Sequence, residues 1–266
     1  GGDVVFWADS DASGAGNIYM EATNTICTGW NFSASTCSLA VGGDIVMGGG
    51  VADANDAGLP AGNANGSGTV AATATGLALG PCTANSATSV NNVFTTRGGN
   101  VILRGASTTG NTSTAAVQSG VVICNGTTFN LGVGKMDVSS QFRAVTATYH
   151  SALFIAPWIA APNANAVVVN SINTASDALD IRAWGSNGDY TSFGLTFNNS
   201  AGGGALFELD SIYANSAANF NFNSAGPMRI VPVSTSFASP MNLGSNFTLS
   251  STATLSFSFS CGEAIA

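Results

Sequence analysis

Apolar and polar residues alternate with a period of two along much of the chain, and this spacing is typical of β-strands. The clearest case is Thr254–Cys261, in which Leu255, Phe257, Phe259 and Cys261 share one face and only Thr and Ser occupy the other. Such a strand buries one face and leaves the other to water or to a partner. The pattern predicts an antiparallel sheet with one uncovered face.

Helix signals are nearly absent, because no window keeps the i, i+3, i+4 apolar spacing and Gly, Asn, Ser and Thr disfavour helix interiors. Segments 178–184 and 190–197 are predicted to pair as a hairpin, since Asn187-Gly188 between them suits a tight turn with positive φ. We place the centre of the core in 141–200, which contains the longest apolar run. The other predicted strands are 4–8, 18–20, 39–47, 93–96, 100–103, 120–124, 128–133, 141–149, 166–169, 205–213, 219–223, 228–233 and 247–249.

This pattern predicts an all-β protein, and a β-sandwich of jelly-roll type is the favoured architecture. A right-handed β-helix is the alternative, but it should show a steady coil period of about 20 residues, and no fixed repeat is visible. We expect one domain over residues 1–266. Its N-terminal strand, residues 1–8, is free to be donated to a neighbour, and residues 48–92 form a Gly-, Ala- and Asn-rich insertion.

Charged residues make up only 8% of the chain, against about 25% in typical soluble domains. Six basic and 14 acidic residues give a formal net charge of −8. A nucleic-acid partner is therefore excluded, because binding to phosphate needs clustered cations. Ala152–Ala161 is the best candidate for a membrane span, but it has ten residues and contains Pro157, whereas a span needs roughly 20.

The chain begins Gly1-Gly2-Asp3, and we interpret this start as a processed N-terminus after removal of a signal peptide. Five cysteines without the paired spacing of a zinc site fit an oxidising compartment. Cys27 and Cys37 bracket a short loop and are expected to form a disulfide, and Cys82 and Cys124 are the next candidate pair. Cys261 is then left over. The alternative is a set of reduced, buried thiols.

The acidic turn Asp9-Ser-Asp11-Ala-Ser13-Gly14 resembles the start of a calcium loop, because oxygen side chains alternate before a glycine. Asp9, Asp11, Ser13 and Glu21 are therefore candidate calcium ligands, although Met20 stands where an EF-hand needs its glutamate. A solvated turn without metal is the competing interpretation.

A second acidic turn, Asp53-Ala-Asn55-Asp56-Ala-Gly58, is weaker. Asp180, Glu208 and Asp210 are candidate carboxylates for glycoside hydrolysis, with Asp177 close to them in the sequence. His150, the only histidine, lacks a nucleophile elbow to support a catalytic triad. No recognisable catalytic motif is present, so we expect no enzyme.

The leading hypothesis is a secreted structural subunit that polymerises with copies of itself into an extracellular filament or sheath. Val4, Val5, Phe6 and Trp7 would complete a neighbour's sheet by donor-strand exchange. The alternatives are a virion or appendage shell protein, and a β-helical adhesin or polysaccharide-active enzyme.

Overall fold

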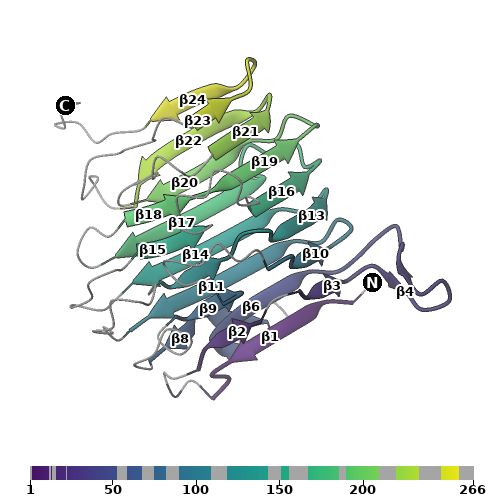
Figure 1. The fold of residues 1–266 in the computed structure, drawn as a ribbon, viewed down its shortest axis with the longest axis vertical. Coiled ribbons are helices and arrows are strands. Elements are labelled where there is room, and N and C mark those ends of the chain that lie inside the picture. Colours follow the sequence, from purple (N-terminus) through teal and green to yellow (C-terminus); the bar gives the residue numbers. More distant parts are fainter. Residues whose placement is uncertain are drawn as a thin grey trace.

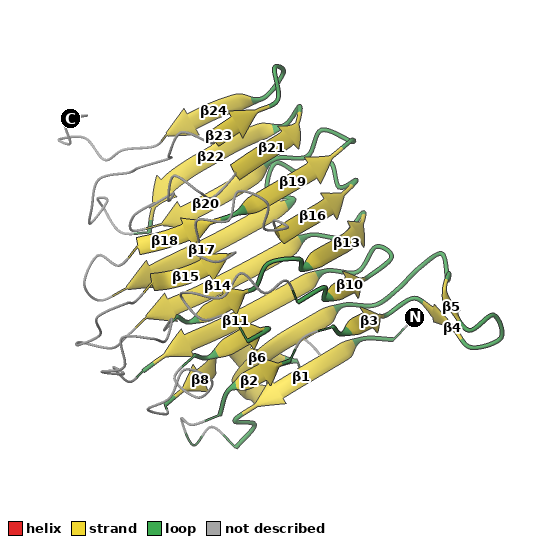
Figure 2. Ribbon diagram, in the orientation of Figure 1, coloured by secondary structure: helices red, strands yellow, loops and turns green. Residues whose placement is uncertain are grey.

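The computed structural model describes the following residues: 2–11, 13, 16–21, 23–52, 59–67, 75–81, 90–108, 119–142, 151–155, 167–185, 190–209, 220–233 and 247–257. All of the regular secondary structure in these ranges is strand, joined by loops and turns (Figure 2), which confirms the all-β class. Within these ranges there is no helix of the length and hydrophobicity needed to cross a membrane.

Three sheets account for nearly all of the strands, and we call them sheets A, B and C. Sheet A has the order β1 (Val4–Ala8), β6 (Ile45–Ala52), β11 (Val101–Ser107), β14 (Met136–Phe142), β17 (Leu179–Gly185), β20 (Ala205–Leu209), β22 (Pro227–Pro232) and β24 (Thr254–Phe257), and β7 (Pro60–Gly62) and β8 (Ala64–Gly66) pair beside it. Sheet B has the order β18 (Tyr190–Phe193), β15 (Ser151–Ile155), β12 (Val121–Ile123), β9 (Leu77–Leu79) and β2 (Ile18–Met20). Sheet C has the order β23 (Phe247–Leu249), β21 (Phe220–Ser224), β19 (Leu195–Asn199), β16 (Val167–Ser171), β13 (Thr128–Gly132), β10 (Val93–Thr95) and β3 (Thr25–Cys27).

The chain visits the three sheets in turn and then returns to the first. β11, β12 and β13 lie in sheets A, B and C, and β14, β15 and β16 repeat the same circuit one layer further along. Each strand pairs in parallel with its counterpart in the next circuit, for example Met136 with Leu179 and Leu179 with Ala205. We call one such circuit a coil. Figure 1 shows the coils stacked from β1 at one end to β24 at the other.

The predicted antiparallel pairing is wrong. β24 pairs in parallel with β22, and among the named strands of the described residues only β4 (Trp30–Asn31) with β5 (Thr36–Cys37) and β6 with β7 are antiparallel. The predicted hairpin is wrong as well, because β17 lies in sheet A and β18 in sheet B. Period-two alternation reports which face is buried and carries no information about strand direction.

The described part of residues 48–92 includes several strands of the sheets. β7 and β8 pair with β6 and β11, and β9 is a central strand of sheet B whose Leu77 and Leu79 are fully buried. The rest of this stretch, including Asp53-Ala-Asn55-Asp56-Ala-Gly58, lies outside the described residues.

The core runs along the inside of the coils. In sheet C, the inward positions of β10, β13, β16, β19 and β21 stack in register. Phe94 lies on Phe129 with ring centroids 5.0 Å apart, and Phe197 lies on Phe222 at 5.5 Å. All four rings are fully buried. Stacked aromatic rings bury much apolar surface and add a specific attraction.

The outer face of sheet C carries a ladder of asparagines. The side-chain Nδ2 of Asn170 donates to Asn130 Oδ1, that of Asn198 donates to Asn170 Oδ1, and that of Asn223 donates to Asn198 Oδ1, each at 2.9 Å. Parallel in-register pairing places identical amides one above another, so each amide satisfies its neighbour. The ladder ties four successive coils together.

Glycines allow the coils to approach closely where sheet C turns into sheet A. A Cβ on Gly99 would lie 2.0 Å from the backbone oxygen of Gly43, and one on Gly134 would lie 1.9 Å from that of Gly99. No other residue fits at these distances, so three consecutive coils share one glycine column at this corner.

We expect Phe129→Ala to lower the free energy of unfolding by about 3–5 kcal/mol, because it removes a fully buried ring and leaves a cavity beside Phe94. Phe32→Ala is the matched control, because Phe32 is 87% exposed. Chemical denaturation followed by circular dichroism measures both variants. Equal effects at the two positions would contradict the assignment of the core.

Candidate functional site

Two carboxylates lie side by side on the outer face of sheet A. Asp137 on β14 is the register partner of Asp180 on β17. Both point outward, because their neighbours along each strand are buried. Neighbouring parallel strands are about 4.8 Å apart, so the two carboxylates are close neighbours across the sheet.

The environment of this pair favours the protonated carboxyl. The pKa of Asp180 rises to about 6, first because burial penalises the charged form and then because Asp137, Glu208 and Asp177 are negatively charged. Burial also raises the pKa of Asp137, against the opposing charges of Arg104 and Lys135. A carboxyl with a pKa near neutrality can donate or accept a proton under ordinary conditions.

Basic and aromatic side chains flank the pair. Arg182 on β17 stands beside its register partner Glu208 on β20, with Nε and Oε2 3.7 Å apart. Its guanidinium also lies 5.2 Å from the centre of the Trp184 ring. Arg104 on β11 donates from Nη1 to the Pro60 oxygen at 2.8 Å. The outer face of sheet A therefore combines carboxylates, guanidinium groups and an indole within neighbouring strands.

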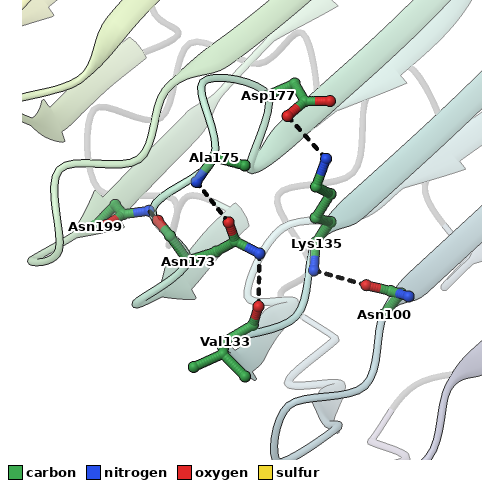
Figure 3. A network of polar contacts seen from close by, with 7 residues as sticks. All are labelled: Asn100, Val133, Lys135, Asn173, Ala175, Asp177 and Asn199. Atoms are coloured by element: carbon green, nitrogen blue, oxygen red, sulfur yellow. Dashed lines mark hydrogen bonds and ion pairs between the residues drawn. The ribbon is translucent and has the colours of Figure 1, made fainter.

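A polar network holds the turns that lead into β14 and β17 (Figure 3). Lys135 Nζ lies 2.8 Å from Asp177 Oδ1, and the backbone NH of Lys135 donates to Asn100 Oδ1 at 2.9 Å. Asn173 bridges two coils, because its Nδ2 donates to the Val133 oxygen while its Oδ1 accepts from the Ala175 NH. These bonds set the entry of both strands and hence the positions of Asp137 and Asp180.

The structure places the candidate carboxylates for glycoside hydrolysis in different environments. Asp180 and Glu208 lie on one face of sheet A, whereas Asp177 pairs with Lys135, whose hydrogen bond lowers the pKa of Asp177. Asp210 and His150 lie outside the described residues. Sequence reasoning missed Asp137, although Met136–Phe142 alternates clearly. Its partner emerges only from the parallel register.

Hydrogen bonds join side chains within the acidic turn, and the candidate calcium site there stays a prediction. Ser13 Oγ donates to Asp9 Oδ1 at 2.7 Å, and the Ser13 NH donates to Asp11 Oδ1 at 3.3 Å. Across the described part of the chain, no three or more His, Cys, Asp or Glu residues are placed to hold a metal ion. The loop is a hydrogen-bonded turn.

Cys27 and Cys37 form a disulfide, as their spacing predicts. The bridge joins β3 to the hairpin of β4 and β5, and Arg97 holds the same hairpin by donating from Nη2 to the Cys37 oxygen at 2.6 Å. Cys124 is also disulfide-bonded. Its predicted partner Cys82 lies outside the described residues, as does Cys261.

The N-terminal strand belongs to the sheet of its own chain. Val4, Val5, Phe6 and Trp7 form β1, which pairs in parallel with β6. Trp7 Nε1 also donates to the Gly50 oxygen at 2.7 Å. Within the described strands β1 is the edge of sheet A, so its other side has no strand beside it.

Exposed apolar side chains gather near this end of the coil stack. The described residues include eight large hydrophobic side chains that are exposed, and six of them lie in the first 52 residues: Val5, Tyr19, Trp30, Phe32, Val41 and Val51. Phe32 is the extreme case at 87% exposure. It lies in the β4–β5 hairpin, which projects from the body of the coils (Figure 2).

Comparison of the chain with protein-family models, with curated proteins and with solved structures finds no match. The function must therefore be argued from the geometry of sheet A and of the N-terminal end.

We expect Asp180→Asn to raise the melting temperature at pH 7 and to change it little at pH 4. Because the pKa of Asp180 is raised in the folded protein, the protonated carboxyl contributes to the free energy of unfolding. This contribution is fully present below the unfolded pKa of about 3.9 and is lost as the pH rises through about 6. At pH 7, Asp180→Asn should raise the free energy of unfolding by about 1 kcal/mol, because solvent screens the charge of a half-exposed carboxyl.

Asp177→Asn is the control, because its effect on the melting temperature should have the opposite dependence on pH. The pKa of Asp177 is lowered, so its contribution is present at neutral pH and is lost on acidification. Thermal melts of both variants between pH 4 and pH 7 provide the measurement. A pH profile of Asp180→Asn that parallels the parent protein contradicts the raised pKa.

Proposed function

We infer that the coils form a β-helix, with the right-handed winding that parallel crossovers adopt in nearly all cases. The regular visits to sheets A, B and C support this inference, together with the in-register ladders along the stack. A jelly roll is built from antiparallel strands, which does not fit the parallel pairs described above.

We propose that the chain is an extracellular structural subunit that assembles with copies of itself, end to end along the coil axis. The observation that carries the proposal is the concentration of exposed apolar side chains in the first 52 residues. Clustered exposed apolar surface marks sites of association. The low charge of the chain supports the same proposal, because it leaves little repulsion between copies.

The edges of the sheets provide the geometry of the contact. Among the described strands, β1 and β24 are the two edges of sheet A. β1 pairs in parallel with β6, and β24 pairs in parallel with β22. The edge of β24 in one copy can therefore continue the sheet at the edge of β1 in the next. Contacts of this head-to-tail kind extend without closing and give a filament.

This mode of assembly leaves β1 in its own sheet, in contrast to donor-strand exchange. The backbone of β1 is already paired with β6, so donating it to a neighbour would first break those hydrogen bonds. Two disulfide-bonded sites, Cys27 with Cys37 and Cys124, support an oxidising, extracellular setting. A closed shell built from the same subunit is the alternative assembly.

The outer face of sheet A favours a second candidate function, the recognition or cleavage of a glycan. Asp137 and Asp180 stand on adjacent strands, a separation close to the approximately 5–5.5 Å between the carboxyl groups of retaining glycosidases. One of them has a pKa near 6, as a general acid requires. Trp184 on the same face offers a ring on which a sugar can pack.

We expect the double substitution of Val5→Thr with Phe32→Ser to reduce self-association, because it removes apolar surface from the N-terminal end. Electron microscopy and sedimentation velocity measure filament yield and subunit size. Val133→Thr is the control, since Val133 is 61% exposed but lies outside the N-terminal cluster. Filaments at full yield from the double variant would contradict end-to-end assembly through this surface.

Deleting residues 1–8 separates the two assembly modes. Donor-strand exchange predicts folded monomers, because only the donated strand is lost. End-to-end stacking predicts that β6 becomes the new edge of sheet A, so that weakened assembly continues. Closed particles of uniform size would favour the shell alternative.

For the glycan candidate, we expect Asp180→Asn or Asp137→Asn to abolish turnover of a neutral glycan while the protein stays folded. Glu208→Gln tests the carboxylate that pairs with Arg182, and its effect should be smaller because it lies diagonally from Asp180. Reducing-sugar release over a glycan panel is the measurement. Turnover that survives Asp180→Asn unchanged would exclude this pair as the catalytic carboxylates.

A further inference from the structure

Three fully buried polar side chains meet where sheet B turns into sheet C. Asn92 and Thr127 are 0% exposed and Asn125 is 1% exposed. Four of their side-chain atoms have no hydrogen-bond partner in the described part of the chain: Asn92 Nδ2, Asn125 Nδ2, Asn125 Oδ1 and Thr127 Oγ1. A buried polar atom without a partner is costly, and native structures rarely keep one.

Backbone hydrogen bonds place these residues in one corner of two successive coils. The Val90 NH donates to the Asn125 oxygen, and the Thr128 NH donates to the Asn92 oxygen, both at 2.8 Å. The segment Val90–Asn92 of one coil thus runs beside Asn125–Thr127 of the next. We call these two segments the B–C corner.

Hydrogen bonds fix the local conformation on both sides of the B–C corner. The Thr127 NH donates to the Cys124 oxygen at 3.3 Å, and Gly126 has a φ of 76°, which makes 124–127 a tight turn that requires glycine at its third position. Asn92 is oriented by Asn24, whose backbone NH donates to Asn92 Oδ1 at 2.8 Å. Asn92 Nδ2 is consequently the end left without an acceptor.

We propose that the B–C corner binds ordered water through Asn92, Asn125 and Thr127. The chemistry of the four atoms decides the ligand. The two Nδ2 groups offer hydrogens that repel a metal cation, and Asn125 Oδ1 is an acceptor that repels an anion. Water accepts two hydrogen bonds and donates two, so it suits donors and acceptors together, as buried water does elsewhere.

Bound water at this position connects two coils through side chains that the asparagine ladder does not reach. Thr127 immediately precedes β13, and Asn92 immediately precedes β10. The corner lies one residue before both strands, so it sets where sheet C begins in each coil. The water is part of the packing between these coils.

A crystal structure of the intact chain, at a resolution that shows ordered water, is the direct test. We expect density within hydrogen-bond distance of at least two of the four atoms. A dry corner, or partners supplied by the chain itself, would overturn the proposal.

Thr127→Val and Thr128→Val form a matched pair for solution work. Thr127→Val deletes the buried hydroxyl and should lower the melting temperature by roughly 2–4 °C, because the bound water loses a partner. Thr128 faces outward between Val93 and Val168 in register, so Thr128→Val should leave the melting temperature unchanged. If Thr127→Val melts at or above the temperature of the parent protein, the hydroxyl has no bound partner and the proposal fails.

Discussion

Parallel, in-register pairing between successive coils is the constraint on which the rest of this structure depends. Each residue lies over the residue at the same position of the next coil, so side chains of one kind form ladders along the stack. Phenylalanines stack inside sheet C, asparagines bond to one another outside it, and glycines line the corner before sheet A. These ladders hold successive coils together, as antiparallel pairing within hairpins does in antiparallel folds.

The same register also creates the molecule's chemically unusual face. Asp137 and Asp180 are far apart in sequence, yet stacking brings their carboxylates onto adjacent strands, where burial raises both pKa values and the negative charge of Asp137 adds to the rise at Asp180. A sheet tolerates like charges side by side only at a cost. Arg104 and Lys135 offset part of that cost for Asp137, and the polar network around Lys135 holds the strands in place.

The ends of the stack differ from its sides. Along the sides, the inner strands of each sheet have a neighbour on both edges, and an asparagine ladder runs along the outer face of sheet C. Near the N-terminal end, β1 has an open edge among the described strands, and the disulfide-linked β4–β5 hairpin presents Phe32 to solvent. The association proposed along the coil axis and the ligand binding proposed on the side of sheet A would therefore use separate surfaces.

Alternation and composition by themselves determined the all-β class, most strand positions and the Cys27–Cys37 disulfide, because these depend on short-range spacing. The repeat of the fold was hidden because successive coils differ in length. The starts of β11 and β14, Val101 and Met136, are 35 residues apart, whereas the starts of β20 and β22, Ala205 and Pro227, are only 22 apart. The glycine pairs at 42–43, 98–99 and 203–204, each close before a sheet A strand, were the available signal. Tertiary structure alone decided strand direction, the Asp137–Asp180 pair and the buried B–C corner. These features depend on which residues of different coils become neighbours, and loops of unequal length conceal that information in the sequence.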